Sequence, residues 1–154
     1  MIGKGFLQSH ALFGGLSDEE IEHVQSYLKP VSLAAGDMVV VEGCTHGRLC
    51  FICTGRVEIL KRLPTGEVAK LAELKQGDAF GEMEFIDVQP AVASVRAVEA
   101  TELLTLTNRD LYQVSKWNLR TFTMLILNMA REISRRLRKM DELAATALYQ
   151  NQHS

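Results

Sequence analysis

Four side chains that could coordinate a metal, or react as thiols, lie within ten residues of one another: Cys44, His46, Cys50 and Cys53. Thiolate and imidazole are the usual ligands of zinc and of iron–sulfur clusters. Cys50 and Cys53, however, lie on one apparent strand at an odd spacing, which turns their side chains to opposite faces. We therefore predict packed free thiols and no metal site, and keep a metal or redox sensor using these four residues as an alternative.

A second candidate site lies between Gly77 and Ala97, in the segment GDAFGEMEFIDVQPAVASVRA. A strand that runs into Gly81 and Glu82 at the start of a helical turn presents unpaired backbone N–H groups, which favour an anion. The glycine permits close approach of a ligand, and the Glu82 carboxylate suits a sugar hydroxyl. The alternative is a plain turn, because Gly-Glu after a strand is a common pair.

The other polar residues give little support for catalysis or for nucleic-acid binding. The 154-residue chain has a net charge of −2, so a dedicated nucleic-acid binder is not expected. The four histidines come without a nucleophile elbow or a Walker loop, and we predict that the protein is not an enzyme. One basic group is interpreted as a solvated helix face. It comprises Arg131, Arg135, Arg136, Arg138 and Lys139.

Composition indicates a single cytoplasmic domain. The chain is 47% hydrophobic and 23% charged, enough apolar residue to bury the core of one domain. Its longest apolar runs, at 38–41 and 124–127, are far shorter than the roughly 20 residues that span a bilayer. Three cysteines cannot all pair within one chain, which fits a reducing compartment. We therefore expect no membrane segment and a cytoplasmic location.

The elements that position these residues are helices at both ends and strands between them. Ser17 and Glu20 form a capping box before a short amphipathic helix whose apolar pattern runs to Leu28 and ends at Pro30. From about residue 31 to 107, short apolar segments alternate with turns. Six or more strands are expected, near 38–42, 49–53, 56–62, 68–74, 92–98 and 102–107, with a hairpin turn at 64–66. This pattern predicts a mainly β fold with flanking helices, an antiparallel sandwich or jelly roll.

The C-terminal third predicts two helices. Asn108 is placed to cap a short helix that ends near Trp117, and Asn118 to cap a long one. Apolar residues then recur every three or four positions from Phe122 to Leu148, along a helix about 45 Å long. Because one domain cannot cover such a face, we predict a homodimer, or a protein partner, on this helix. The dimer-helix residues are Met129, Ile133, Leu137 and Met140.

These segments resemble the cyclic-nucleotide-binding domain of catabolite-activator-type regulators, kinase regulatory subunits and cyclic-nucleotide-gated channels. AAGDMVVVEG and LCFICTGRVEIL resemble its first signature, with Gly43 and Gly55 at the two expected glycines, and NMAREISRRLRKMDEL resembles its long C-terminal helix. The resemblance implies one domain over residues 1–154, with a β-roll (a double-stranded β-helix or jelly roll) at 31–107. An N-terminal helical segment at 1–30 and C-terminal helices at 108–150 flank it. It also implies that the helix-turn-helix of full-length regulators is not in this chain.

The phosphate-binding cassette of the family matches only in part. The resemblance places Phe80, Gly81 and Glu82 at its start, with glutamate as the ligand of the ribose 2′-hydroxyl. Ala91 stands where the family has the arginine that holds the cyclic phosphate, and Glu84 replaces a small residue. Arg96 lies on the opposite strand face by parity and cannot replace that arginine, whereas Arg48 could. The candidate ligand-binding residues are Phe80, Gly81, Glu82, Met83, Ala91, Val92, Ala93 and Ser94.

From these residues we predict a non-catalytic regulatory and signalling module with a degenerate phosphate site. It dimerises through its C-terminal helix and takes a possible small-molecule ligand. Its alternative is a true cAMP or cGMP receptor with an altered phosphate contact.

Overall fold

The computed structural model describes residues 4–154 and begins with three short helical segments. These are α1 (Lys4–Ser9), the single 3₁₀ turn η1 (Ala11–Phe13) and α2 (Asp18–Gln25). The predicted capping box is confirmed, since Ser17 Oγ accepts from the Glu20 N–H and Glu20 Oε1 accepts from the Ser17 N–H. The predicted helical pattern through Leu28 is wrong, because α2 ends at Gln25 and a turn leads from it into the first strand.

Within residues 4–154, eight strands form two four-stranded antiparallel sheets, which confirms the predicted jelly roll. One sheet has the order β1-β8-β3-β6 and the other β2-β7-β4-β5. The sequence pattern did not predict β1, because Pro30 was interpreted only as the end of a helical pattern. The two-residue strand β6 is the strand that was expected to run into Gly81. The strands are β1 (Lys29–Leu33), β2 (Met38–Val40), β3 (Arg48–Thr54), β4 (Arg56–Arg62), β5 (Val68–Lys75), β6 (Ala79–Phe80), β7 (Ser94–Ala97) and β8 (Thr101–Thr107).

Two apolar cores hold these layers together. One fills the roll between the sheets and includes Ile52, Phe80 and Ala91. The other lies between the first sheet and the helices and includes Phe51, Phe85 and Met129. Neighbouring residues on β3 therefore belong to different cores, because successive side chains of a strand point to opposite faces.

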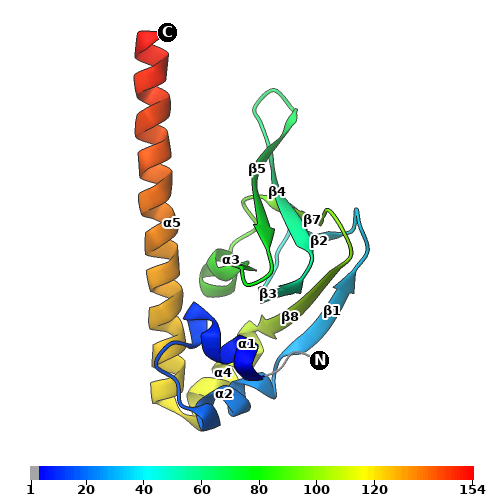
Figure 1. The fold of residues 1–154 in the computed structure, drawn as a ribbon, viewed down its shortest axis with the longest axis vertical. Helices are drawn as coiled ribbons and strands as arrows, with labels where there is room; N and C mark the ends of the chain where they lie inside the picture. The colour runs from blue at the N-terminus through cyan, green and yellow to red at the C-terminus, as the bar shows by residue number, and fades with distance from the viewer. Residues whose placement is uncertain (1–3) are drawn as a thin grey trace.

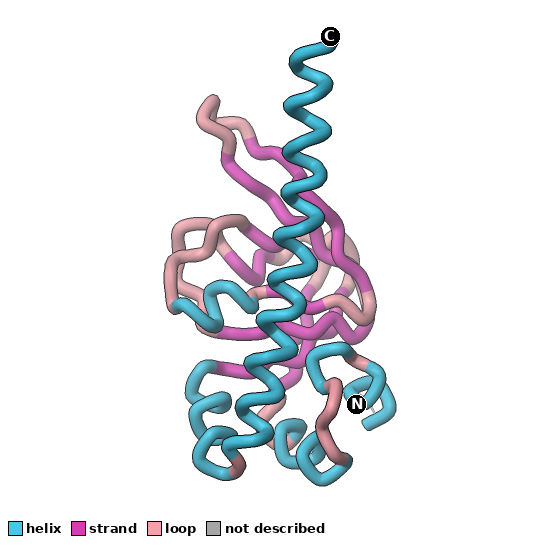
Figure 2. Tube along the Cα trace, turned by 90° about the vertical axis from the view of Figure 1, so that its left-hand side faces the viewer, coloured by secondary structure: helices cyan, strands magenta, loops and turns pink. Residues whose placement is uncertain are grey.

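The remaining helices are α3 (Glu82–Asp87), α4 (Asn108–Trp117) and α5 (Leu119–His153). The N-cap of α4 is Thr107 and not Asn108 as predicted, because the Thr107 hydroxyl accepts from the Asp110 N–H. Asn118 caps α5 as expected. The first turns of α5 pack on the domain, and its C-terminal part projects beyond the other elements in both views (Figures 1 and 2). Within residues 4–154, none of the helices is long and apolar enough to cross a membrane.

Glu20 ties the N-terminal segment to α5 and makes the fold sensitive to acid. It is buried, and although burial raises its pKa, hydrogen bonds from Thr121, from the Ser17 backbone and from Arg120 outweigh it and lower the pKa to about 2. Since this lies below the ordinary 4.5, Glu20 stabilises the fold above about pH 4.5 and ceases to do so as the pH falls toward 2.

We expect Glu20→Gln to reduce the free energy of unfolding by about 1 to 3 kcal/mol at pH 7. Below pH 4 the variant and the wild type should differ by less, because the wild type then loses the stabilisation by Glu20. Urea titrations of the wild type and the variant at both pH values measure it. The exposed Glu19, one residue away in the same turn, provides the control Glu19→Gln. An equal cost for both variants at pH 7 would contradict the assignment.

Candidate functional site

The cassette, which we define as residues 80–94, begins where β6 turns into α3. Gly81 has φ +87°, and a Cβ atom at this position would lie 2.4 Å from the Arg48 carbonyl oxygen. Register pairs Phe80 with Cys50, so β3 fixes the position of the turn. Glycine is therefore required here for conformation and for close packing.

Gly77 offers a matched comparison for this requirement. It has φ +92°, but nothing lies within 4 Å of its added Cβ. We expect Gly77→Ala to cost about 1 to 2 kcal/mol from backbone strain alone, and Gly81→Ala to cost about 1 to 3 kcal/mol more from the clash. Chemical denaturation of both variants measures the difference, and equal costs would show that the turn yields to the extra methyl group.

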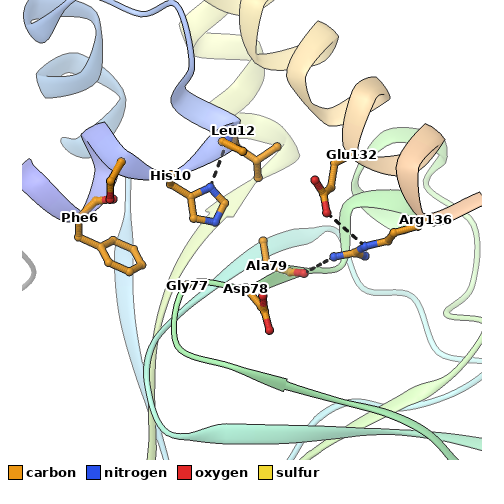
Figure 3. A pocket seen from close by; sticks show the side chains of 10 residues that line it. Phe6, His10, Leu12, Gly77, Asp78, Ala79, Glu132 and Arg136 are labelled. Atoms are coloured by element: carbon orange, nitrogen blue, oxygen red, sulfur yellow. Dashed lines mark hydrogen bonds and ion pairs between the residues drawn. The ribbon is translucent and has the colours of Figure 1, made fainter. Parts of the chain in front are cut away.

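Glu82 is held by the long C-terminal helix. It is 3% exposed, and Oε1 accepts from Arg136 Nη1. Arg136 Nη2 also donates to the Ala79 carbonyl at 2.6 Å (Figure 3). The other carboxylate oxygen, Oε2, is buried without a hydrogen-bond partner. The solvated-face interpretation is thus wrong for Arg136, although the other members of that basic group are exposed.

The C-terminal end of the cassette contains no arginine, and Ala91, Glu84 and Lys61 lie around its backbone. Ala91 is 3% exposed and packs in the core of the roll. Glu84, 8% exposed, accepts from the Val92 N–H at 3.3 Å through Oε1. Lys61 on β4 donates from Nζ to the Val92 carbonyl at 2.5 Å. The Val92 backbone therefore has a carboxylate on its N–H and an ammonium on its carbonyl.

The two arginines considered as replacements differ in their surroundings. Arg96 forms an ion pair with Glu58 at 2.5 Å on the outer side of the second sheet, which agrees with its parity. Arg48 is half-buried at the start of β3, and within residues 4–154 its side chain makes neither a hydrogen bond nor an ion pair. The contact between Lys61 and the Val92 carbonyl was not predicted, because nothing in the local sequence distinguishes Lys61 from other strand lysines.

The remaining candidate residues divide between core and surface. Phe80 is 3% exposed and lies in the roll, whereas Met83 and Val92 are about half exposed. Ala93 is partly buried. The Ser94 hydroxyl accepts from the Glu42 N–H at 2.8 Å, which joins the end of the cassette to the loop after β2.

The cysteine and histidine group does not assemble into a metal site. Among residues 4–154, no three His, Cys, Asp or Glu side chains gather in a way that could hold a metal. Burial raises the pKa of Cys50 to about 12 and that of Cys53 to about 11, and Cys44 is exposed. His46 instead packs beside Gly81, and burial, aided by the Arg48 charge, lowers its pKa.

The residues assigned to the dimer helix differ in exposure. Met129 is 1% exposed and belongs to the core of the domain, and Ile133 is partly buried. Leu137 and Met140 are each about 60% exposed. The apolar face of α5 thus passes from the core to the surface between residues 129 and 137.

Comparison with known proteins finds related sequences. The family described as the cyclic nucleotide-binding domain matches residues 30–117. The cyclic AMP receptor protein of Thermus thermophilus is 31% identical over 88% of this chain and 61% of its own length. A CRP-like cAMP-activated global transcriptional regulator of Mycobacterium tuberculosis is 26% identical over 90% of this chain and 60% of its own. The chain thus spans about three-fifths of the length of these curated relatives.

Solved structures with a similar fold include proteins of the same family. A cyclic nucleotide-binding domain from Methylobacillus flagellatus superposes with a TM-score of 0.80 at 26% identity, over 88% of this chain and 76% of that one. The catabolite activator protein of Thermus thermophilus superposes with a TM-score of 0.79 at 32% identity, over 89% and 63% of the two chains.

Proposed function

The chain belongs to the cyclic nucleotide-binding domain family, and from that premise we propose that it is a non-catalytic regulatory module whose cassette lacks the charge that holds a cyclic phosphate. The observation that carries the proposal is the pair formed by Ala91 and Glu84. Ala91 is buried in the roll where the family pattern has arginine, and the Glu84 carboxylate takes the neighbouring backbone N–H. A cyclic phosphate bound here would find no positive charge from residue 91 and would be repelled by the Glu84 carboxylate.

The bond between Glu82 and Arg136 adds a second obstacle to a ligand. A ribose hydroxyl that binds Glu82 has to share the carboxylate with Arg136 or displace it. Because Arg136 also holds the Ala79 carbonyl, α5 is fixed to both sides of the Gly81 turn. A ligand at Glu82 would therefore act directly on the helix that we propose as the dimer contact.

We propose a homodimer formed through α5. Leu137, Met140 and Leu143 are each more than half exposed, along one face of a helix that the domain covers only at its beginning. Exposed apolar stripes at heptad-like spacing usually pair with a second helix. Ile133 lies at the edge of this stripe, next to the turn that carries Arg136.

A true receptor for cAMP or cGMP is the second candidate, and Lys61 is the observation that favours it. Its ammonium group already lies at the Val92 carbonyl, so it could supply part of the missing charge. The partly buried Lys61 also lies 3.8 Å from Glu42, and that carboxylate competes with a ligand for its ammonium group.

Calorimetric titration of the unmodified protein with cAMP and with cGMP tests the proposal. We expect binding to be weak or undetectable. Micromolar or tighter binding would support the receptor, and Lys61→Met should then reduce the affinity about tenfold if Lys61 supplies the charge. Lys75→Met, at the other end of the hairpin, is the control for a general loss of positive charge.

A further inference from the structure

Both carboxylates of the cassette keep one oxygen to which no group within residues 4–154 donates a hydrogen bond. Glu82 Oε2 is buried and has no hydrogen-bond partner. Glu84 is also buried, and only its Oε1 accepts, from the Val92 N–H. A buried acceptor without a donor is unfavourable. These two oxygens therefore favour a ligand that donates hydrogen bonds.

The charges around the two carboxylates favour a ligand without a net charge. Arg136 holds Glu82 Oε1, and the Lys61 ammonium group lies at the Val92 carbonyl, so a cationic ligand would meet two like charges. An anionic ligand would be repelled by Glu84, which has no ion pair with any residue from 4 to 154. Hydroxyl groups donate to both carboxylates without adding a charge.

Apolar side chains beside these carboxylates offer a surface for an aromatic ring. Met83 and Val92 are about half exposed. On β4, Ile59 lies on the same strand face as Lys61, which contacts the Val92 carbonyl. Register pairs Ile59 with the exposed Ala72 of β5. An apolar surface next to two acceptors suits a flat base that is joined to a hydroxylated sugar.

On the basis of the proposed function, we propose that the cassette binds a ribonucleoside that carries no phosphate group. Glu82 Oε2 accepts from the ribose 2′-hydroxyl, and Arg136 keeps the other oxygen of that carboxylate. Glu84 Oε2 accepts from the 5′-hydroxyl, where a phosphate would be repelled. The base lies against Met83 and Val92. The absence of a positive charge at Ala91 then suits the neutral ligand.

Calorimetric titration of the full chain with adenosine, guanosine, cytidine and uridine, each added singly, tests the proposal. Two matched probes each change one group of the nucleoside. The 2′-deoxynucleoside lacks the hydroxyl for Glu82, and the 5′-monophosphate places an anion beside Glu84. We expect at least one ribonucleoside to bind in a saturable manner. Its 2′-deoxy form and its 5′-monophosphate should each bind at least tenfold more weakly.

Two variants locate the repulsion of the phosphate. Glu84→Gln retains an acceptor for the Val92 N–H but removes the negative charge. It should reduce the ratio of nucleoside affinity to monophosphate affinity at least tenfold. Asp87→Asn is the matched control and should leave the ratio unchanged, because the exposed Asp87 also lies on α3 and also accepts from a backbone N–H. Thermal unfolding verifies that both variants are folded.

The inference and the proposed function fail through different results. The inference is overturned if none of the four ribonucleosides binds, or if the 5′-monophosphate or the 2′-deoxy form binds as tightly as its ribonucleoside. An equal affinity ratio in the two variants also overturns it. These results leave the proposed function intact as long as cAMP and cGMP bind weakly. Micromolar binding of cAMP or cGMP contradicts both.

Discussion

The combination of Ala91→Arg and Glu84→Ala is expected to raise the affinity for cAMP and cGMP by roughly 30- to 1,000-fold. The arginine restores a guanidinium for the cyclic phosphate. The alanine removes the carboxylate that now takes the Val92 N–H. One or two charge-assisted contacts of about 2 kcal/mol each account for this range. Titration calorimetry with both nucleotides, on the wild type and on each single variant, measures the two contributions separately.

Charge and side-chain length have to be distinguished at Ala91, because this residue lies in the core. Ala91→Met with Glu84→Ala introduces a long side chain without charge, and we expect it to lack most of the gain. Val41 and Val92, each about half exposed, indicate that solvent lies close to this part of the roll, which gives an arginine a route outward. Thermal unfolding of every variant establishes that it is folded.

The result can contradict the proposal in two ways. If methionine and arginine variants bind equally, the missing charge is not the defect. If the folded arginine variant shows no gain, the obstacle lies elsewhere. Arg136→Gln, which frees Glu82 from α5, then tests whether that bond blocks the ribose position. Arg135→Gln, at the preceding residue, is the control for the loss of one positive charge from this part of α5.

The sequence predicts most of the local structure because local structure depends on neighbouring residues. The Ser17 capping box, the Asn118 cap and the hairpin through Gly66 each need contacts over only a few positions, and all three are present. The cassette was located by its glycine and glutamate, and the glycine occupies a turn in which a Cβ atom would lie 2.4 Å from the Arg48 carbonyl oxygen.

The contacts that decide the chemistry of the site join residues far apart in the chain. Arg136 lies 54 positions from Glu82, and Lys61 lies 31 positions from Val92. Periodicity shows that Arg136 is off the apolar stripe, but not that β6 passes beside that turn of α5. Long-range packing likewise decides that Met129 belongs to the core and Leu137 to the surface, since both fall on one helical face in the sequence pattern.

Ile133→Glu combined with Leu137→Glu is expected to weaken dimerisation by roughly 1,000-fold or more and to leave a folded monomer. Each substitution removes an apolar side chain from the proposed contact, at about 1.5 to 3 kcal/mol. It also places a charge where none is paired. Two-fold symmetry repeats both changes on the partner helix. Sedimentation velocity at tens of micromolar should show a dimer for the wild type and a monomer for the variant.

A matched variant separates the loss of the apolar face from the added charge. Ser134→Glu with Thr146→Glu adds the same two negative charges to exposed positions of α5 that lie off the apolar stripe, and it should remain a dimer. Because α5 extends beyond the domain (Figure 2), neither pair of substitutions should unfold the β-roll, which thermal unfolding verifies. A monomeric wild type, or a dimer that survives Ile133→Glu with Leu137→Glu, would remove the basis for pairing through this helix. The exposed stripe would then have to bind a different protein.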